Sequence, residues 1–157
     1  MDRIVVVAIG NTEARFFTLE QAEWPEYESG PHLIEQSSLS RSTEDSARGL
    51  WTKIAKKSTQ NIKASENYRY KFERKFAQKI TGEIIHLIRI EQGQKLVLIA
   101  RPKILKLIHQ FFTPTLFGNL HIQELPRDIS HFGSNQIHQY LAQKQIVPAC
   151  QTVVYPR

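Results

Sequence analysis

The 157-residue sequence has little that would mark it for export, and Cys150 is its only cysteine. A single cysteine cannot form a disulfide within the chain, and no charged segment followed by an apolar core opens the chain. We therefore expect a cytoplasmic protein. The longest apolar cluster, Leu96–Ala100, has the length of a strand, far short of the ~20 residues that cross a bilayer. No membrane-spanning segment is expected.

Motifs that carry chemistry are also scarce. Neither of the glycine-rich nucleotide-binding motifs occurs, and the six histidines are dispersed without paired cysteines, so we predict no metal and no cofactor. Glu83 and His86 have the spacing of a helical metal site, but such sites need further carboxylates. Ser130 and His131 are neighbours in sequence, which rarely brings a nucleophile to its base. Together with a Cys150 that lacks cationic neighbours, these features favour a protein that is not an enzyme.

The amino-terminal part is typical of strands. Residues 3–9 are apolar apart from Arg3 and mostly β-branched, as in a central strand that is buried on both faces. The Gly10-Asn11 pair separates them from a second extended run, residues 13–20, and such a pair is a hairpin signal. These two strands are expected to pair antiparallel. A third, short strand is predicted at residues 32–36, after a turn-rich segment.

Residues 37–67 are rich in Ser, Thr, Lys, Asn and Gln and have few large apolar groups. Such a composition buries too little surface to offset the entropy lost on ordering, so we predict a mobile polar insertion. Within it, residues 50–57 form a short amphipathic patch that includes Leu50, Trp51 and Ile54. This patch is a candidate docking segment for a protein partner or an anionic surface, with docking onto the protein's own body as the favoured alternative.

A long amphipathic helix follows the insertion. Large apolar residues recur every three or four positions from Tyr68 to Ile88, which is the helical period. Between residues 51 and 80, nine Lys or Arg residues oppose two acids, an excess of seven positive charges. The net charge of +6 favours polyanionic partners such as RNA, although many basic helices merely face solvent. The candidate RNA-binding residues on the opposite side of this helix are Arg69, Lys71, Arg74, Lys75 and Lys79.

The remaining elements alternate between strands and helices. Residues 95–100 predict a buried strand, and Arg101-Pro102 opens a helix that ends near Phe112. An edge strand is expected at residues 120–125. Ser134 is predicted to cap a last helix, whose inner face carries Ile137, Tyr140 and Leu141. The element order predicts a single α/β domain over residues 1–157, a sandwich around a mixed sheet.

Three blocks of sequence carry a resemblance to a known family. They are Ala14-Arg15-Phe16-Phe17, the strand that leads into Ala100-Arg101-Pro102, and Leu125-Pro126-Arg127-Asp128-Ile129. The chain resembles the bacterial family described as "protein required for attachment to host cells", which is related to the central domains of archaeal and eukaryotic peptide-chain release factors. It departs from the family pattern at Gly10, where the family tends to have an acid, at Glu13 and at Arg101.

The resemblance implies a translation-type fold and a connection with RNA or the ribosome. Our first hypothesis is therefore a non-catalytic RNA- or ribosome-associated module that uses the basic helix face. The alternative is a protein-interaction or assembly factor that docks through the Trp51 segment. A peptidyl-tRNA hydrolase is least favoured, because Gln92-Gly93-Gln94 lacks the first glycine of the Gly-Gly-Gln tripeptide of release factors and is better explained as a helix stop.

Overall fold

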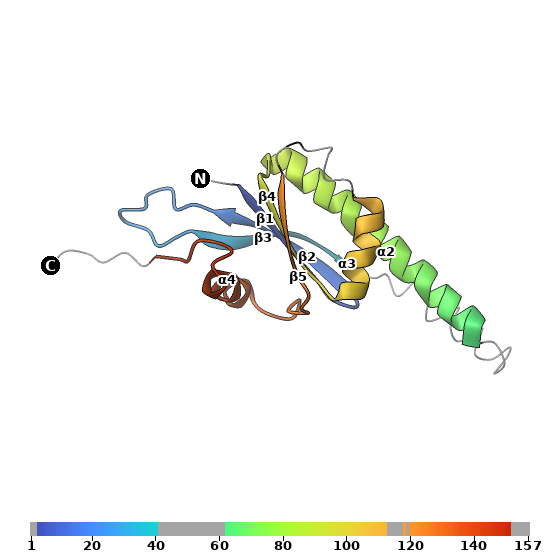
Figure 1. Ribbon diagram of the computed structural model, residues 1–157. Coiled ribbons are helices and arrows are strands. Elements are labelled where there is room, and N and C mark those ends of the chain that lie inside the picture. Colours follow the sequence, from blue (N-terminus) through green and yellow to red (C-terminus); the bar gives the residue numbers. More distant parts are fainter. Residues whose placement is uncertain (1–2, 41–61, 113–117, 119, 152–157) are drawn as a thin grey trace.

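The computed structural model describes residues 3–40, 62–112, 118 and 120–151 (Figure 1). Five strands form one mixed sheet in the order β3-β2-β1-β4-β5. The strands are β1 (Ile4–Ile9), β2 (Glu13–Glu20), β3 (His32–Ser40), β4 (Lys95–Ile99) and β5 (His121–Leu125). The first three strands pair antiparallel, whereas β1, β4 and β5 run parallel. The carboxyl ends of these three strands consequently lie along one edge of the sheet.

Strand β1 lies at the centre of the sheet because every one of its six residues is apolar and buried. Its alternate side chains serve two separate cores. Val5 and Val7 belong to the core beneath the long helix, and Val6 and Ala8 belong to the core on the opposite face. The sequence pattern therefore predicts this strand correctly, including its burial on both faces.

Three described helices cover the two faces of the sheet. Helices α2 (Ile62–Glu91) and α3 (Pro102–Phe111) pack together on one face, and α4 (Ser134–Gln143) lies on the other (Figure 1). Ile80 and Ile84 of α2 are fully buried in the first core, whereas Ile137 and Leu141 of α4 are fully buried in the second. The predicted α/β sandwich with a mixed sheet is confirmed. None of the described helices has the length and apolar character needed to cross a membrane.

Two elements extend into the segment that the sequence predicts to be mobile. Strand β3 continues to Ser40 instead of ending at Gln36, with a register shift opposite Phe16 and Phe17. An edge strand pairs with a single neighbour, and its side chains can be polar and exposed. The polar composition of residues 37–40 therefore led to a prediction that the strand ends too early. Helix α2 begins at Ile62, earlier than the apolar repeat indicated. The rest of the expected insertion, residues 41–61, lies outside the described residues.

The helix ends differ from expectation in two places. The chain leaves α2 through Gln92, whose φ of 52° is in the left-handed region, and the Gly93 N–H then donates to the Ile88 carbonyl over 2.9 Å. A glycine that ends a helix usually adopts the left-handed conformation itself, but here Gln92 adopts it and Gly93 is the next residue. Ser134 was wrongly predicted as the cap of α4, because it is the first residue of the helix and Gly133 is the N-cap. The Gly133 N–H donates to Gln136 Oε1 over 2.8 Å.

Candidate functional site

The predicted RNA-binding residues all lie on α2, and the side chains of four of them are described. Lys71, Lys75 and Lys79 are exposed and follow one another at intervals of four residues. Four residues advance about 6 Å along a helix and turn it by only about 40° past a full turn, so the three ammonium groups form a row. We call Lys71, Lys75 and Lys79 the lysine row. For Arg69 the structure describes the helical backbone only.

Arg74 does not belong to the lysine row. It is exposed, but it lies roughly 100° around the helix from Lys75, and its guanidinium sits 5.5 Å from the centroid of the Phe111 ring on α3. This is the distance of a cation–π contact. Arg74 therefore connects the two helices while its side chain stays exposed, and its role in RNA binding stays a prediction.

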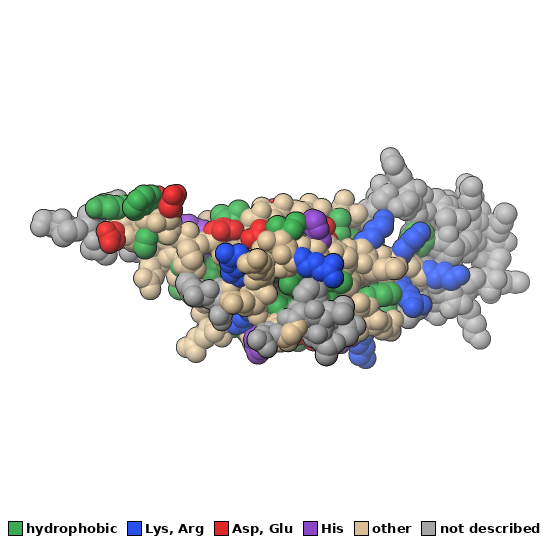
Figure 2. Space-filling model, turned by 90° about the horizontal axis from the view of Figure 1, so that it is seen from above, with side chains coloured by type: hydrophobic (Ala, Val, Ile, Leu, Met, Phe, Trp, Pro, Cys, Tyr) green, Lys and Arg blue, Asp and Glu red, His purple; other side chains and the backbone are tan. Residues whose placement is uncertain are grey.

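Two acids of α2 have partners on neighbouring elements, although Glu83 follows Lys79 by four residues and therefore lies next to the lysine row. Glu73 is half-buried and pairs with Lys103 of α3 over 3.1 Å, while Glu83 accepts a hydrogen bond of 3.1 Å from Ser37 Oγ on β3. From position 71 to 90, where the structure describes α2 side chains, the exposed residues include no Asp or Glu. His86 and Arg89 continue the basic surface toward the helix end. Figure 2 shows the Lys and Arg side chains gathered toward the end of the molecule at which α2 begins.

The predicted protein-docking residues cannot be placed in this way. Leu50, Trp51 and Ile54 lie outside the described residues, so the docking segment stays a prediction.

A second group of polar side chains lies where the parallel strands end. Arg101, directly after β4, pairs with Asp128 over 3.5 Å and donates to Asn11 Oδ1 over 3.2 Å. Asp128 Oδ1 also accepts hydrogen bonds from the Ser130 hydroxyl and backbone N–H, at 2.8 and 3.2 Å. We call Asn11, Arg101, Asp128 and Ser130 the carboxyl-edge cluster. A side-chain Cβ at Gly10 would collide with Ser130 Oγ, so the cluster requires a glycine there.

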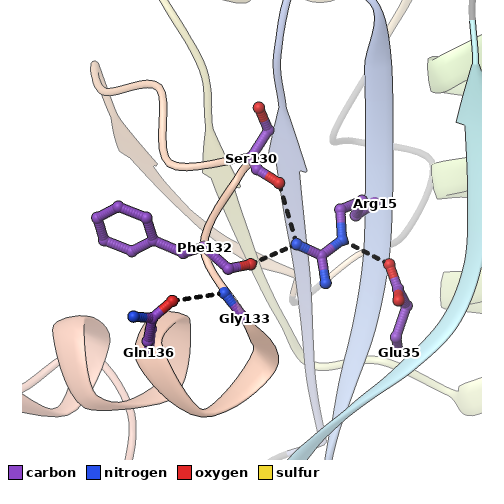
Figure 3. A network of polar contacts seen from close by, with 6 residues as sticks. All are labelled: Arg15, Glu35, Ser130, Phe132, Gly133 and Gln136. Carbon is purple, nitrogen blue, oxygen red and sulfur yellow. Dashed lines mark hydrogen bonds and ion pairs between the residues drawn. The ribbon is translucent and has the colours of Figure 1, made fainter.

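Arg15 anchors the loop that carries this cluster (Figure 3). Its side chain is only 16% exposed, and its Nε donates to Glu35 Oε1 over 2.6 Å. The Nη1 group donates to the Ser130 carbonyl over 3.0 Å and also to the Phe132 carbonyl. The guanidinium stacks 4.9 Å from the centroid of the Phe17 ring. Arg15 therefore connects β2 with β3 and with the loop at residues 130–132, which indicates a role in stability.

The groups considered for catalysis do not form a catalytic arrangement. The Ser130 hydroxyl donates to Asp128, while the His131 ring packs edge-on against Phe132 with centroids 4.9 Å apart. Sequence reasoning missed one contact: Cys150 Sγ lies 3.9 Å from Nδ1 of His32, whose Nε2 is 3.3 Å from Ser29 Oγ. These partners are 118 residues apart, so no local motif reveals them.

In the part of the chain that the structure describes, no three His, Cys, Asp or Glu side chains come together as metal ligands. Glu83 is engaged by Ser37, whereas His86 is exposed. A hollow between α3 and β5 contains the paired side chains of His109 and Glu124 among apolar residues.

Residues 5–141, which run from β1 into α4, match the family described as "Protein required for attachment to host cells". The chain belongs to this family. No curated protein matches the chain. The three sequence blocks that carry the host-attachment resemblance meet in space, because the Arg15 strand, the Arg101 turn and the Asp128 loop all contribute to the carboxyl edge. The residues of these blocks therefore contact one another at the carboxyl edge of the sheet.

Proposed function

We propose that the protein is a non-catalytic module that binds RNA, free or within the ribosome, through the lysine row of α2. The observation that carries the proposal is the sorting of charge around this helix. Lys71, Lys75 and Lys79 are exposed, whereas the half-buried Glu73 and Glu83 pair with Lys103 of α3 and Ser37 of β3. A surface row of one sign, without interspersed acids, attracts a polyanion far better than a mixed surface of equal net charge.

The chemistry of the row suits a phosphate backbone. Each lysine ammonium is a compact, mobile cation that contacts a phosphate without reading a base, so the module is expected to bind with little sequence preference. Neutralising phosphates also releases condensed counterions, which supplies most of the affinity at low salt. The expected resemblance to release-factor central domains would fit the same role, and a partner in the translation machinery is part of this proposal.

The test is a comparison of two variants that lose the same charge. In the row variant, Lys71→Gln, Lys75→Gln and Lys79→Gln are combined. In the control variant, three exposed cations elsewhere are replaced as Arg3→Gln, Arg127→Gln and Lys144→Gln. Affinity for a labelled single-stranded RNA is measured by fluorescence anisotropy at ~50 mM salt, where exposed charges are least screened.

We expect the row variant to bind at least about tenfold more weakly than the wild type, and the control variant to lose much less. Equal losses in the two variants would mean that net charge, and not the row, attracts RNA. Sedimentation of a tagged wild-type protein with ribosomes, compared with the row variant, then distinguishes the ribosome from free RNA as the partner.

A further inference from the structure

The loop between β2 and β3 carries an exposed aromatic surface at the end of the molecule opposite the lysine row. Residues 23–28 are all exposed, and their sequence is Glu-Trp-Pro-Glu-Tyr-Glu. Trp24 is 60% exposed and Tyr27 is 65% exposed. We call residues 23–28 the acidic tip. Two large, exposed aromatic side chains in one short loop are typical of a contact with another molecule.

The acidic tip is held in shape by its own backbone. The N–H groups of Tyr27 and Glu28 donate to the Trp24 carbonyl over 2.9 and 2.8 Å, which forms a helical turn. At its base, Gly30 and Gln151 exchange two backbone hydrogen bonds of 3.2 and 2.8 Å. Ala22 packs so closely on Gly30 that a Cβ there would lie 2.9 Å from the alanine Cβ. A preformed tip loses little entropy when it binds.

The charge of this region identifies the chemistry of its partner. Residues 16–40 contain five Glu and no Lys or Arg, and three of these acids are in the acidic tip. Carboxylates flanking Trp and Tyr rings bind Lys and Arg well, because the ion pairs and the cation–π contacts act on the same cation. Figure 2 shows hydrophobic and acidic side chains at one end of the molecule and basic side chains at the other.

We propose that the acidic tip docks onto the lysine row of a second copy of this chain. The charges are complementary, and the lysines of the row are exposed on a stretch of α2, residues 71–91, whose described side chains include no exposed acid. The loop between β2 and β3 lies at one end of the molecule and α2 begins at the other, so the acidic tip of one copy does not reach its own lysine row (Figure 1). The contact is heterologous, with each copy offering its tip to one neighbour and its row to another.

Two consequences follow from the size and position of these surfaces. Two aromatic side chains and a few ion pairs make a small interface, so the association is weak and exchanges rapidly. Raising the salt concentration weakens it further, because the charged part is exposed. The proposal does not depend on RNA binding, but the acidic tip and RNA would compete for the same lysines.

The test uses sedimentation velocity of the full chain, without RNA, over a range of protein concentrations. A tip variant combines Trp24→Ser with Glu26→Lys, and a row variant combines Lys71→Glu with Lys75→Glu. The matched control is Ile90→Ser, which removes an apolar side chain that is also 60% exposed but lies near the carboxyl end of α2. The wild type and the control are expected to sediment faster as their concentration rises.

Each interface variant alone is expected to associate at least about tenfold more weakly than the wild type. An equimolar mixture of the two variants is the decisive sample, because the tip variant keeps an intact row and the row variant keeps an intact tip. The mixture is expected to form one-to-one pairs and nothing larger. A wild type that stays monomeric, variants that associate as the wild type does, or a mixture that forms no pairs would each overturn the proposal.

Discussion

Arg15 and Lys75 are both cations on regular elements, yet the structure uses them in opposite ways. Arg15 is 16% exposed and donates to Glu35 and to two backbone carbonyls, so its guanidinium stabilises the fold and is little exposed to a partner. Lys75 is exposed on the solvent side of α2, next to Lys71 and Lys79. The comparison teaches that net charge alone says little about a partner. Burial and internal partners decide which cations remain accessible to a polyanion.

A substitution on the buried face of α2 is expected to cause the largest loss of stability. Phe76 lies one residue from Lys75 but is only 7% exposed and belongs to the core with Ile80. Phe76→Ala is expected to lower the free energy of unfolding by about 3 to 5 kcal/mol, because it leaves a cavity in a packed core. Chemical denaturation measures this loss. A loss below about 1 kcal/mol would mean that the two faces of α2 are wrongly assigned.

Replacement of Arg15 is expected to have the next largest effect. Arg15→Met keeps much of the side-chain volume but removes the charge, and it leaves Glu35 and two carbonyls without their donor. We expect the free energy of unfolding to fall by about 2 to 4 kcal/mol. The double variant Arg15→Met with Glu35→Gln serves as the control, since it should recover part of the loss. No loss in the single variant would place Arg15 among the solvent-facing cations.

The ion pair of the carboxyl-edge cluster is expected to have an intermediate effect. The side chains of Arg101 and Asp128 are 55% and 24% exposed, so water screens their attraction. Arg101→Gln is expected to lower the free energy of unfolding by less than about 1 kcal/mol. Thermal unfolding of this variant and of Arg15→Met under the same conditions compares the loss of stability in the two. An equal loss in the two variants would contradict the claim that burial separates them.

The lysine row is expected to matter least for stability. Combining Lys71→Gln, Lys75→Gln and Lys79→Gln should change the free energy of unfolding by less than about 1 kcal/mol in total, because Lys and Gln have similar helix propensities. Circular dichroism during denaturation measures this change. A larger loss would mean that the row supports the fold, and its role in binding would then need variants of another design.

The sequence revealed the parts of this structure whose signals are local. The apolar run of β1 and the repeat that places Phe76, Ile80 and Ile84 inside are patterns within single elements, and they predicted both the elements and their buried faces. The row of exposed lysines follows from the same periodicity. Fold class is predictable in this way because it depends on the order and periodicity of elements.

Features that depend on distant partners were not predictable. Arg15 contacts the Ser130 carbonyl 115 residues away, and Cys150 approaches His32 across 118 residues. The contact of Arg74 with the Phe111 ring was not predictable either, because sequence spacing does not show that α3 lies beside α2. Strand β3 extends to Ser40 because it pairs with β2, and the amino-acid composition of residues 37–40 does not reveal this pairing. Each of these depends on which elements become neighbours in the folded chain.

The salt dependence of RNA binding tests the central claim most directly. If Lys71, Lys75 and Lys79 each neutralise one phosphate, the logarithm of the affinity for single-stranded RNA should fall with the logarithm of salt with a slope of about −2, at roughly −0.7 per contact. In the Lys71→Gln, Lys75→Gln, Lys79→Gln variant, the slope should collapse toward zero while the protein remains folded. A wild-type protein whose affinity and slope equal those of this variant would contradict the account, and the lysine row would then be only a solvated helix face.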